Sequence, residues 1–62
     1  MDKPKCELVG TDGNIFALLG AASKALKRAG LADEAKKMQA EVMQSGSYDA
    51  ALQVICQYVD AY

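Results

Sequence analysis

Apolar side chains recur at helical spacing in three segments of this chain, and the glycines Gly30 and Gly46 separate the segments. Each segment carries polar residues on its opposite face, and such a helix is stabilised mainly by packing its apolar face against other helices. The chain has 62 residues, which leaves room for a single core. The sequence therefore predicts one all-α domain over residues 1–62, built as a three-helix bundle.

The first helix is expected over residues 14–29. Its inward stripe consists of Ile15, Leu18, Leu19, Ala22, Ala25, Leu26 and Ala29. Asn14 supplies a side-chain oxygen that suits the start of this helix, and Gly30 suits the left-handed residue that ends it. Because only Leu31 follows before the next helix, the two helices are expected to fold back as a hairpin.

The second and third helices are expected over residues 32–45 and 48–60. The inward residues of the second are Leu31, Ala35, Met38 and Val42. Those of the third are Ala51, Leu52, Ile55, Tyr58, Val59 and Tyr62. Ser47 suits the cap of the third helix. Asp33 precedes Lys37 by four residues, which favours an ion pair on the outer face of the second helix.

Residues 1–12 are expected to form an extended arm. They contain the only proline, Pro4, and pass through the short run Cys6-Glu7-Leu8-Val9 before a turn-rich segment. A short strand is stable only with a partner, and the sequence shows no evident partner. We therefore expect an irregular or weakly β arm that lies against the bundle.

The residues that usually carry catalysis are scarce. The chain contains no His, the usual base and metal ligand near neutral pH. The neighbouring acids Asp33 and Glu34 diverge by about 100° around their helix. Cys6 and Cys56 lie far apart in the sequence and are expected to be reduced thiols, with a disulfide as the alternative. We therefore expect no enzyme, no cofactor and no metal; a nucleophilic Cys56 without a visible base is the remaining enzymatic alternative.

The segment Gly10-Thr11-Asp12-Gly13-Asn14 has two interpretations. Free amide groups at a helix N-terminus can bind phosphate, but no Lys or Arg follows until Lys24 to balance the charge. The oxygens of Asp12 and Asn14 are too few for a calcium loop. Capping of the first helix is the preferred interpretation, and a recognition loop is the alternative.

The charge of the chain is uneven. Residues 1–28 hold five basic and three acidic groups, or +2, and residues 29–62 hold two basic and five acidic groups, or −3. Lys24, Lys27 and Arg28 lie on one flank of the first helix and are candidate phosphate contacts. The third helix carries Asp49 and Asp60, which argues against its entry into a DNA groove. Binding of nucleic acid through the basic flank is the second hypothesis for the function.

Three apolar residues, Phe16, Met43 and Val54, point away from the centres of their stripes on a helical wheel. If they are exposed, they form a partner surface together with Asn14; otherwise they pack at the edge of the core. A small domain gains stability by association. The leading hypothesis is a non-enzymatic accessory or adaptor protein that binds another protein or itself. No apolar stretch reaches the ~18 residues of a membrane span, so we expect a cytoplasmic protein.

The run from Val9 to Gly20, followed by Lys24-Ala25-Leu26-Lys27-Arg28-Ala29-Gly30 and Ser45-Gly46-Ser47-Tyr48-Asp49, resembles a family of small uncharacterised bacterial proteins. Members of that family often occur on phages and other mobile elements. The resemblance extends from Cys6 to Asp60, and its most specific part is Gly-Thr-Asp-Gly-Asn-x-Phe, residues 10–16. It implies a compact helical fold and a mobile-element setting, and it transfers no catalytic or binding residue.

Overall fold

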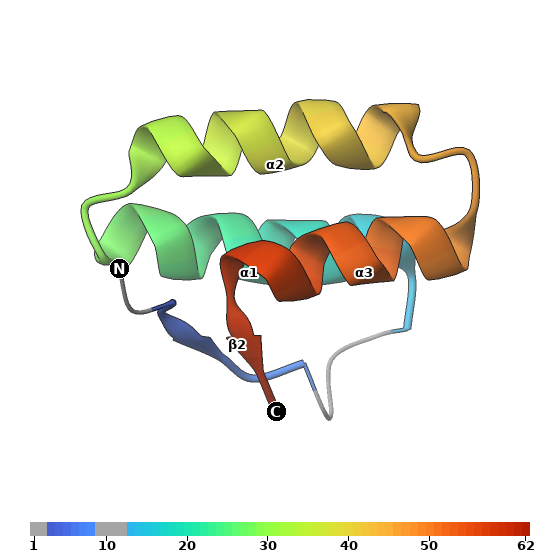
Figure 1. The fold of residues 1–62 in the computed structure, drawn as a ribbon. Helices are drawn as coiled ribbons and strands as arrows, with labels where there is room; N and C mark the ends of the chain where they lie inside the picture. Colours follow the sequence, from blue (N-terminus) through green and yellow to red (C-terminus); the bar gives the residue numbers. More distant parts are fainter. Residues whose placement is uncertain (1–2, 9–12) are drawn as a thin grey trace.

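The computed structural model describes residues 3–8 and 13–62. It contains the helices α1 (Ile15–Arg28), α2 (Ala32–Gln44) and α3 (Tyr48–Tyr58). In Figure 1, α2 lies above a layer formed by α1 and α3, and a small sheet lies below that layer. The predicted three-helix bundle is confirmed, and the predicted helix boundaries differ from the observed ones by at most two residues.

The turn between α1 and α2 is a glycine-based helix ending. Gly30 has φ +79°, its amide donates to the Lys27 carbonyl at 3.1 Å, and the Leu31 amide donates to the Leu26 carbonyl at 2.8 Å. These two bonds satisfy carbonyl groups that the end of a helix otherwise leaves free. The chain therefore reverses within three residues, and the predicted hairpin is confirmed.

The turn between α2 and α3 combines a second positive-φ glycine with a serine cap. Gly46 has φ +81°, and the Ser47 Oγ accepts a hydrogen bond from the Ala50 amide at 3.1 Å. A cap of this kind replaces a missing intrahelical partner in the first turn. Ser47 therefore fixes the start of α3 as its sequence position indicates.

Two glycine-to-alanine substitutions are expected to change stability in opposite directions. Gly20 lies on the exposed side of α1, where an added Cβ would meet no heavy atom within 4 Å, so Gly20→Ala should stabilise the domain by about 0.8–1 kcal/mol. Gly30 is equally open but has φ +79°, so Gly30→Ala should destabilise it by about 1–2 kcal/mol. Urea unfolding followed by circular dichroism measures both; equal effects of the two variants would contradict the helix ending at Gly30.

The core lies where the three helical stripes meet. Its largest fully buried side chains are Leu26, Met38, Ile55 and Val59. Ser23 is the one buried polar residue in the described ranges, and its Oγ accepts a hydrogen bond from the Gln39 Nε2 at 2.9 Å across α1 and α2. This bond meets the requirement that a buried hydroxyl have a partner, and it links the two helices along one side of the bundle.

The end of α3 differs from the prediction. The helix stops at Tyr58, and Val59 is extended with φ −131° and ψ 155°. Val59 is nevertheless buried in the core. Because helical spacing no longer applies beyond Tyr58, Tyr62 does not follow Val59 into the core and is 60% exposed. The prediction that Tyr62 continues the inward stripe is wrong for this reason.

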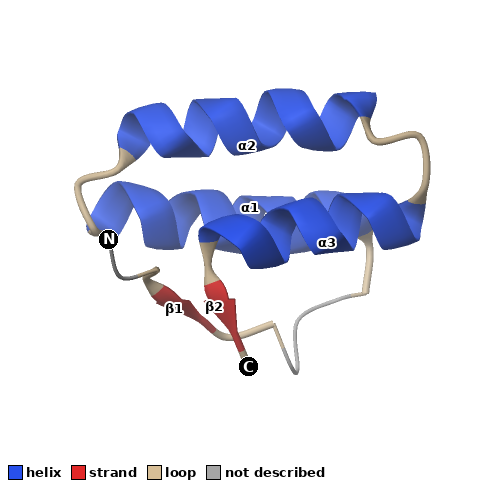
Figure 2. Cartoon of the chain, in the orientation of Figure 1, coloured by secondary structure: helices blue, strands red, loops and turns tan. Residues whose placement is uncertain are grey.

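The N-terminal arm pairs with the C-terminal end of the chain. Strand β1 (Lys5–Cys6) lies parallel to β2 (Asp60–Ala61), with Lys5 opposite Asp60 and Cys6 opposite Ala61. Figure 2 shows the two strands side by side beneath the helices. The arm is thus β-paired, within the expectation of an irregular or weakly β segment. Its partner was not evident from the sequence because parallel strands need a long connection, and here all three helices form it.

Polar contacts outside the core are few in the described residues. The Lys3 Nζ donates to the Cys56 carbonyl at 3.1 Å, where a cation also suits the C-terminal end of the α3 dipole. The Lys37 Nζ lies 3.5 Å from the Glu34 Oε1, so this lysine pairs with Glu34 and the expected pair with Asp33 is wrong.

In the described part of the chain, no helix is long and apolar enough to cross a membrane.

Candidate functional site

Large apolar side chains are exposed at one end of the bundle. This end is where α1 begins, α2 ends and α3 begins, on the right in Figure 1. Phe16 is 66% exposed, Met43 67% and Tyr48 47%. Each comes from a different helix or its end, and the burial of three such side chains by a partner would be favourable. We call these three residues the apolar end.

The apolar end surrounds a hollow of about 280 Å³. The hollow is lined by Phe16, Met43 and Tyr48 together with Ile15, Leu19, Val42, Ser45, Gly46, Ser47 and Ala51. Val54 does not belong to this lining; it is half-buried and packs against the core. The structure thus brings together two of the predicted surface residues and places the third at the edge of the core.

Asn14 lies directly before the apolar end and caps α1. Its Oδ1 accepts a hydrogen bond from the Phe16 amide at 2.8 Å. The Tyr48 hydroxyl donates to the Gly13 carbonyl at 2.6 Å, so an α3 side chain holds the chain just before the cap. The capping role predicted for Asn14 is confirmed; residues 10–12 of the predicted turn lie outside the described residues.

Sequence reasoning missed Tyr48. Its spacing of seven residues from the buried Ile55 places it on the inward side of a helical wheel, which predicts burial. It is half exposed because it is the first residue of α3, at the open end of the bundle. The sequence signal that could have predicted this exposure is the position of an aromatic residue in the first turn of a helix.

A second hollow, of about 360 Å³, runs along α1 and α2. Lys24 and Lys27 line it together with Phe16, Leu19, Gly20, Ser23 and Gln39. Both lysines are exposed, as is Arg28, which does not line the hollow. None of these three cations forms an ion pair with another described residue. The predicted basic flank is therefore exposed, and Phe16 joins it to the apolar end.

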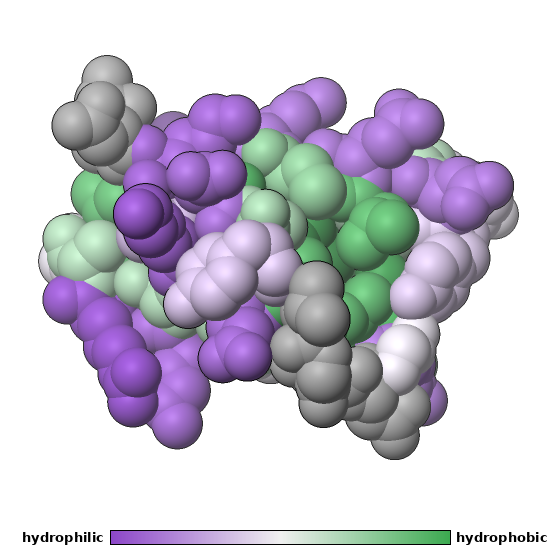
Figure 3. All heavy atoms as spheres, turned by 90° about the horizontal axis from the view of Figure 1, so that it is seen from below, coloured by the Kyte–Doolittle hydropathy of each residue, from purple (hydrophilic) through white to green (hydrophobic). Residues whose placement is uncertain are grey.

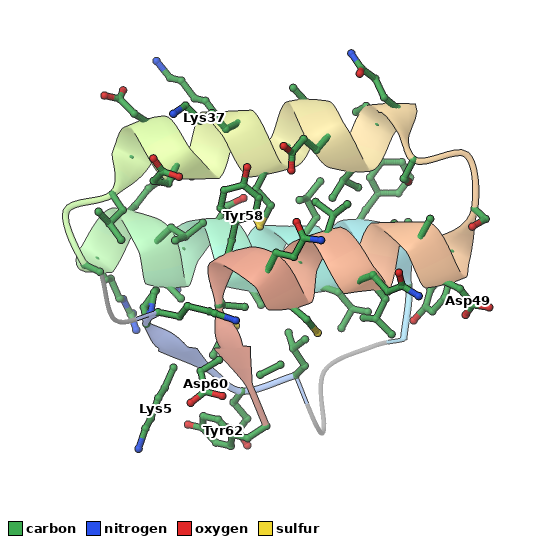
Figure 4. The ribbon with its side chains drawn as sticks, viewed as in Figure 1. Lys5, Lys37, Asp49, Tyr58, Asp60 and Tyr62 are labelled. Atoms are coloured by element: carbon green, nitrogen blue, oxygen red, sulfur yellow. The ribbon has the colours of Figure 1, made fainter. Side chains whose placement is uncertain are left out.

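The side of α2 that faces α3 lies opposite the basic hollow and is acidic. Tyr58 of α3 points toward α2 in Figure 4. Burial, a hydrogen bond to Glu41 and the negative charges of Glu41 and Glu34 raise the pKa of the Tyr58 hydroxyl above its usual value. Both carboxylates thus lie near Tyr58, and neither of them lines the basic hollow.

The underside of the bundle carries an apolar groove of about 380 Å³. Its lining consists of Leu8, Gly13, Leu18, Tyr48, Leu52, Cys56, Ala61 and Tyr62. Figure 3 shows apolar residues gathered on this face between hydrophilic ones. Among the described residues this lining contains no charged side chain, so the groove offers a ligand mainly apolar contacts and little that would select one ligand over another.

Both cysteines are free thiols, as the sequence predicts. Cys6 is buried and Cys56 is exposed. Burial raises the pKa of the Cys6 thiol, which lowers the fraction of reactive thiolate. No group of three or more Cys, Asp or Glu residues in the described ranges is arranged to hold a metal ion.

No protein family model, curated protein or solved structure matches this chain. The resemblance to small mobile-element proteins therefore stays a prediction, as does the cytoplasmic location.

Proposed function

We propose that this protein is a non-enzymatic adaptor that binds another protein through the apolar end. The observation that carries the proposal is the convergence of Phe16, Met43 and Tyr48 from three helices around one hollow. Exposed apolar side chains that cluster around a concavity are typical of binding sites. Aromatic residues and methionine are also enriched in protein interfaces.

The bundle gives this surface a rigid support. Phe16 follows a capped helix start, and Tyr48 follows the Ser47 cap and is held by its bond to Gly13. A side chain that is already positioned loses less conformational entropy when a partner binds. The apolar end is therefore suited to recognition by a preformed surface.

Binding of nucleic acid is the second candidate, and the exposed cations Lys24, Lys27 and Arg28 favour it. Three cations provide few phosphate contacts, and Phe16 is the one aromatic residue that borders the basic hollow among its described lining residues. Stacking of several bases requires several aromatic platforms. Protein binding therefore accounts for more of the exposed surface.

The test is affinity capture from the cells that produce this protein, with and without nuclease treatment, followed by quantitative mass spectrometry. Phe16→Ser combined with Met43→Ser should lower recovery of a stoichiometric partner about tenfold or more, which corresponds to about 1.4 kcal/mol or more. Tyr62→Ser is the matched control, because Tyr62 is 60% exposed but lies on the underside groove and not at the apolar end.

Recovery that survives nuclease and depends on Phe16 and Met43 supports the adaptor function. A second copy of the chain as the captured protein would give the same support, and sedimentation would then reveal a dimer. Partners that disappear with nuclease would contradict the proposal and favour the nucleic-acid alternative. Partners that the double variant retains in full would contradict the apolar end as the binding site.

A further inference from the structure

We infer that the partner presents an acidic amphipathic helix, which lies along α1 with its apolar residues on the apolar end and its carboxylates at Lys24 and Lys27. This inference rests on the proposed function and adds the chemistry of the partner. The apolar hollow and the basic hollow share Phe16 and Leu19 in their linings. They therefore form one continuous surface, apolar at the start of α1 and basic toward its end.

Gly20 lies in the middle of this surface. It is exposed within α1, and a Cβ added to it would meet no heavy atom of the described residues within 4 Å. Glycine lowers helix stability relative to alanine, so packing inside the chain gives no reason for it here. A missing side chain between Phe16 and Lys24 lets another backbone approach α1 closely. This position is thus suited to the close approach of a helix that lies along α1.

The charged side chains that line this surface, among the described residues, are basic. Lys24 and Lys27 line the hollow from α1, and Lys36 lies one turn before Gln39, on the side of α2 that bonds to Ser23. The α2 carboxylates near Tyr58, those of Glu34 and Glu41, lie toward α3. A ligand on the α1 side of α2 therefore meets several cations, which favours an acidic partner.

The acidic side of α2 in a second copy of this chain fits the surface less well than a separate acidic helix does. Its carboxylates Glu34 and Glu41 lie beside Tyr58, which is half-buried. The large apolar side chains that are exposed in the described residues are Phe16, Met43, Tyr48 and Tyr62. Of these, Met43 belongs to α2, but it lines the apolar hollow beside Phe16 and not the side of α2 near Tyr58. The acidic side of α2 therefore lacks an exposed large apolar anchor for the hollow at Phe16.

The test is selection from a displayed library of random peptides about 16 residues long, or about four helical turns, against the immobilised protein. Peptides that also bind the Phe16→Ser, Met43→Ser protein are removed. The selected peptides should combine apolar residues at spacings of three and four with an excess of Asp and Glu. One of them is then synthesised, and its affinity is measured by titration calorimetry.

Lys24→Glu combined with Lys27→Glu should weaken this peptide about tenfold or more, whereas Arg28→Glu should weaken it less than about threefold. Arg28 is the matched control because it is exposed on the same helix but does not line the hollow. Gly20→Leu should also weaken binding about tenfold, because a side chain would occupy the approach to α1. Since all these positions are exposed, the variants should keep the circular dichroism spectrum of the folded domain.

The other outcomes separate the two proposals. Selected peptides without an acidic excess, sensitive to Phe16 and Met43 but not to Lys24 and Lys27, would overturn the inference and leave the adaptor function intact. Failure to select any peptide specific for the apolar end would count against both. A dimer that Lys24→Glu and Lys27→Glu dissociate, or binding of a DNA duplex that these changes abolish while Phe16→Ser does not, would also overturn the inference.

Discussion

Met38→Ala is expected to lower the free energy of unfolding by about 2–5 kcal/mol. Met38 is fully buried between the helices, and truncation of such a side chain removes apolar burial and leaves a cavity. A domain of 62 residues has a total stability of about 3–9 kcal/mol. The variant should therefore lose a large part of the stability of the domain, as urea denaturation followed by circular dichroism will measure.

Met43→Ala is the matched control for this prediction. It is the same substitution in the same helix, but the Met43 side chain is 67% exposed where that of Met38 is 0% exposed. The control should change stability by about 0.5 kcal/mol or less. Equal losses in the two variants would mean that α2 does not turn its Met38 face toward the core.

A chain that ends at Val59 is expected to expose the Cys6 thiol. The deletion removes backbone hydrogen bonds between the arm and the C-terminal end, among them the bonds from Asp60 to Pro4, from Tyr62 to Cys6, and from Leu8 to Tyr62. At about 0.5–1.5 kcal/mol each, the loss of these three bonds amounts to about 1.5–4.5 kcal/mol. With Cys56→Ser as background, the reaction of Cys6 with a disulfide reagent should accelerate about 10- to 1000-fold, the ratio that such energies correspond to.

Two effects act in the same direction in this measurement. Burial shields the Cys6 sulfur, and burial also raises the pKa of its thiol, so that less thiolate is present at neutral pH. When the arm separates from the bundle, the Cys6 sulfur becomes accessible and the pKa of its thiol is no longer raised by burial. Tyr62→Ala in the same background is the control, because it keeps the backbone bonds and changes an exposed side chain. An unchanged rate in the shortened chain would show that the sheet does not protect Cys6.

The core and the terminal sheet are separate from the binding surface. Met38 and Cys6 are buried, whereas Phe16, Met43 and Lys24 are exposed. Changes at the surface are therefore expected to alter binding with little loss of stability. This separation lets the adaptor proposal be tested with folded variants.

The sequence by itself determined the three helices, because their evidence is local. The inward stripes around Met38 and Ile55 repeat within a few residues, and Gly30, Gly46 and Ser47 act on their immediate neighbours through φ angles and caps. Helix ends and core faces follow from such short-range interactions. The capping role of Asn14 belongs to the same class.

The tertiary structure decided what depends on distant residues. The pairing of Cys6 with Ala61 joins the two ends of the chain, and no local pattern indicates it. The sequence left Phe16, Met43 and Val54 open between exposure and packing at the edge of the core. Only the packing of three helices left the first two exposed, placed Tyr48 beside them and put Val54 against the core. Periodicity tells which side of a helix turns inward; it does not tell where the neighbouring helices end, and that decides which apolar side chains stay exposed.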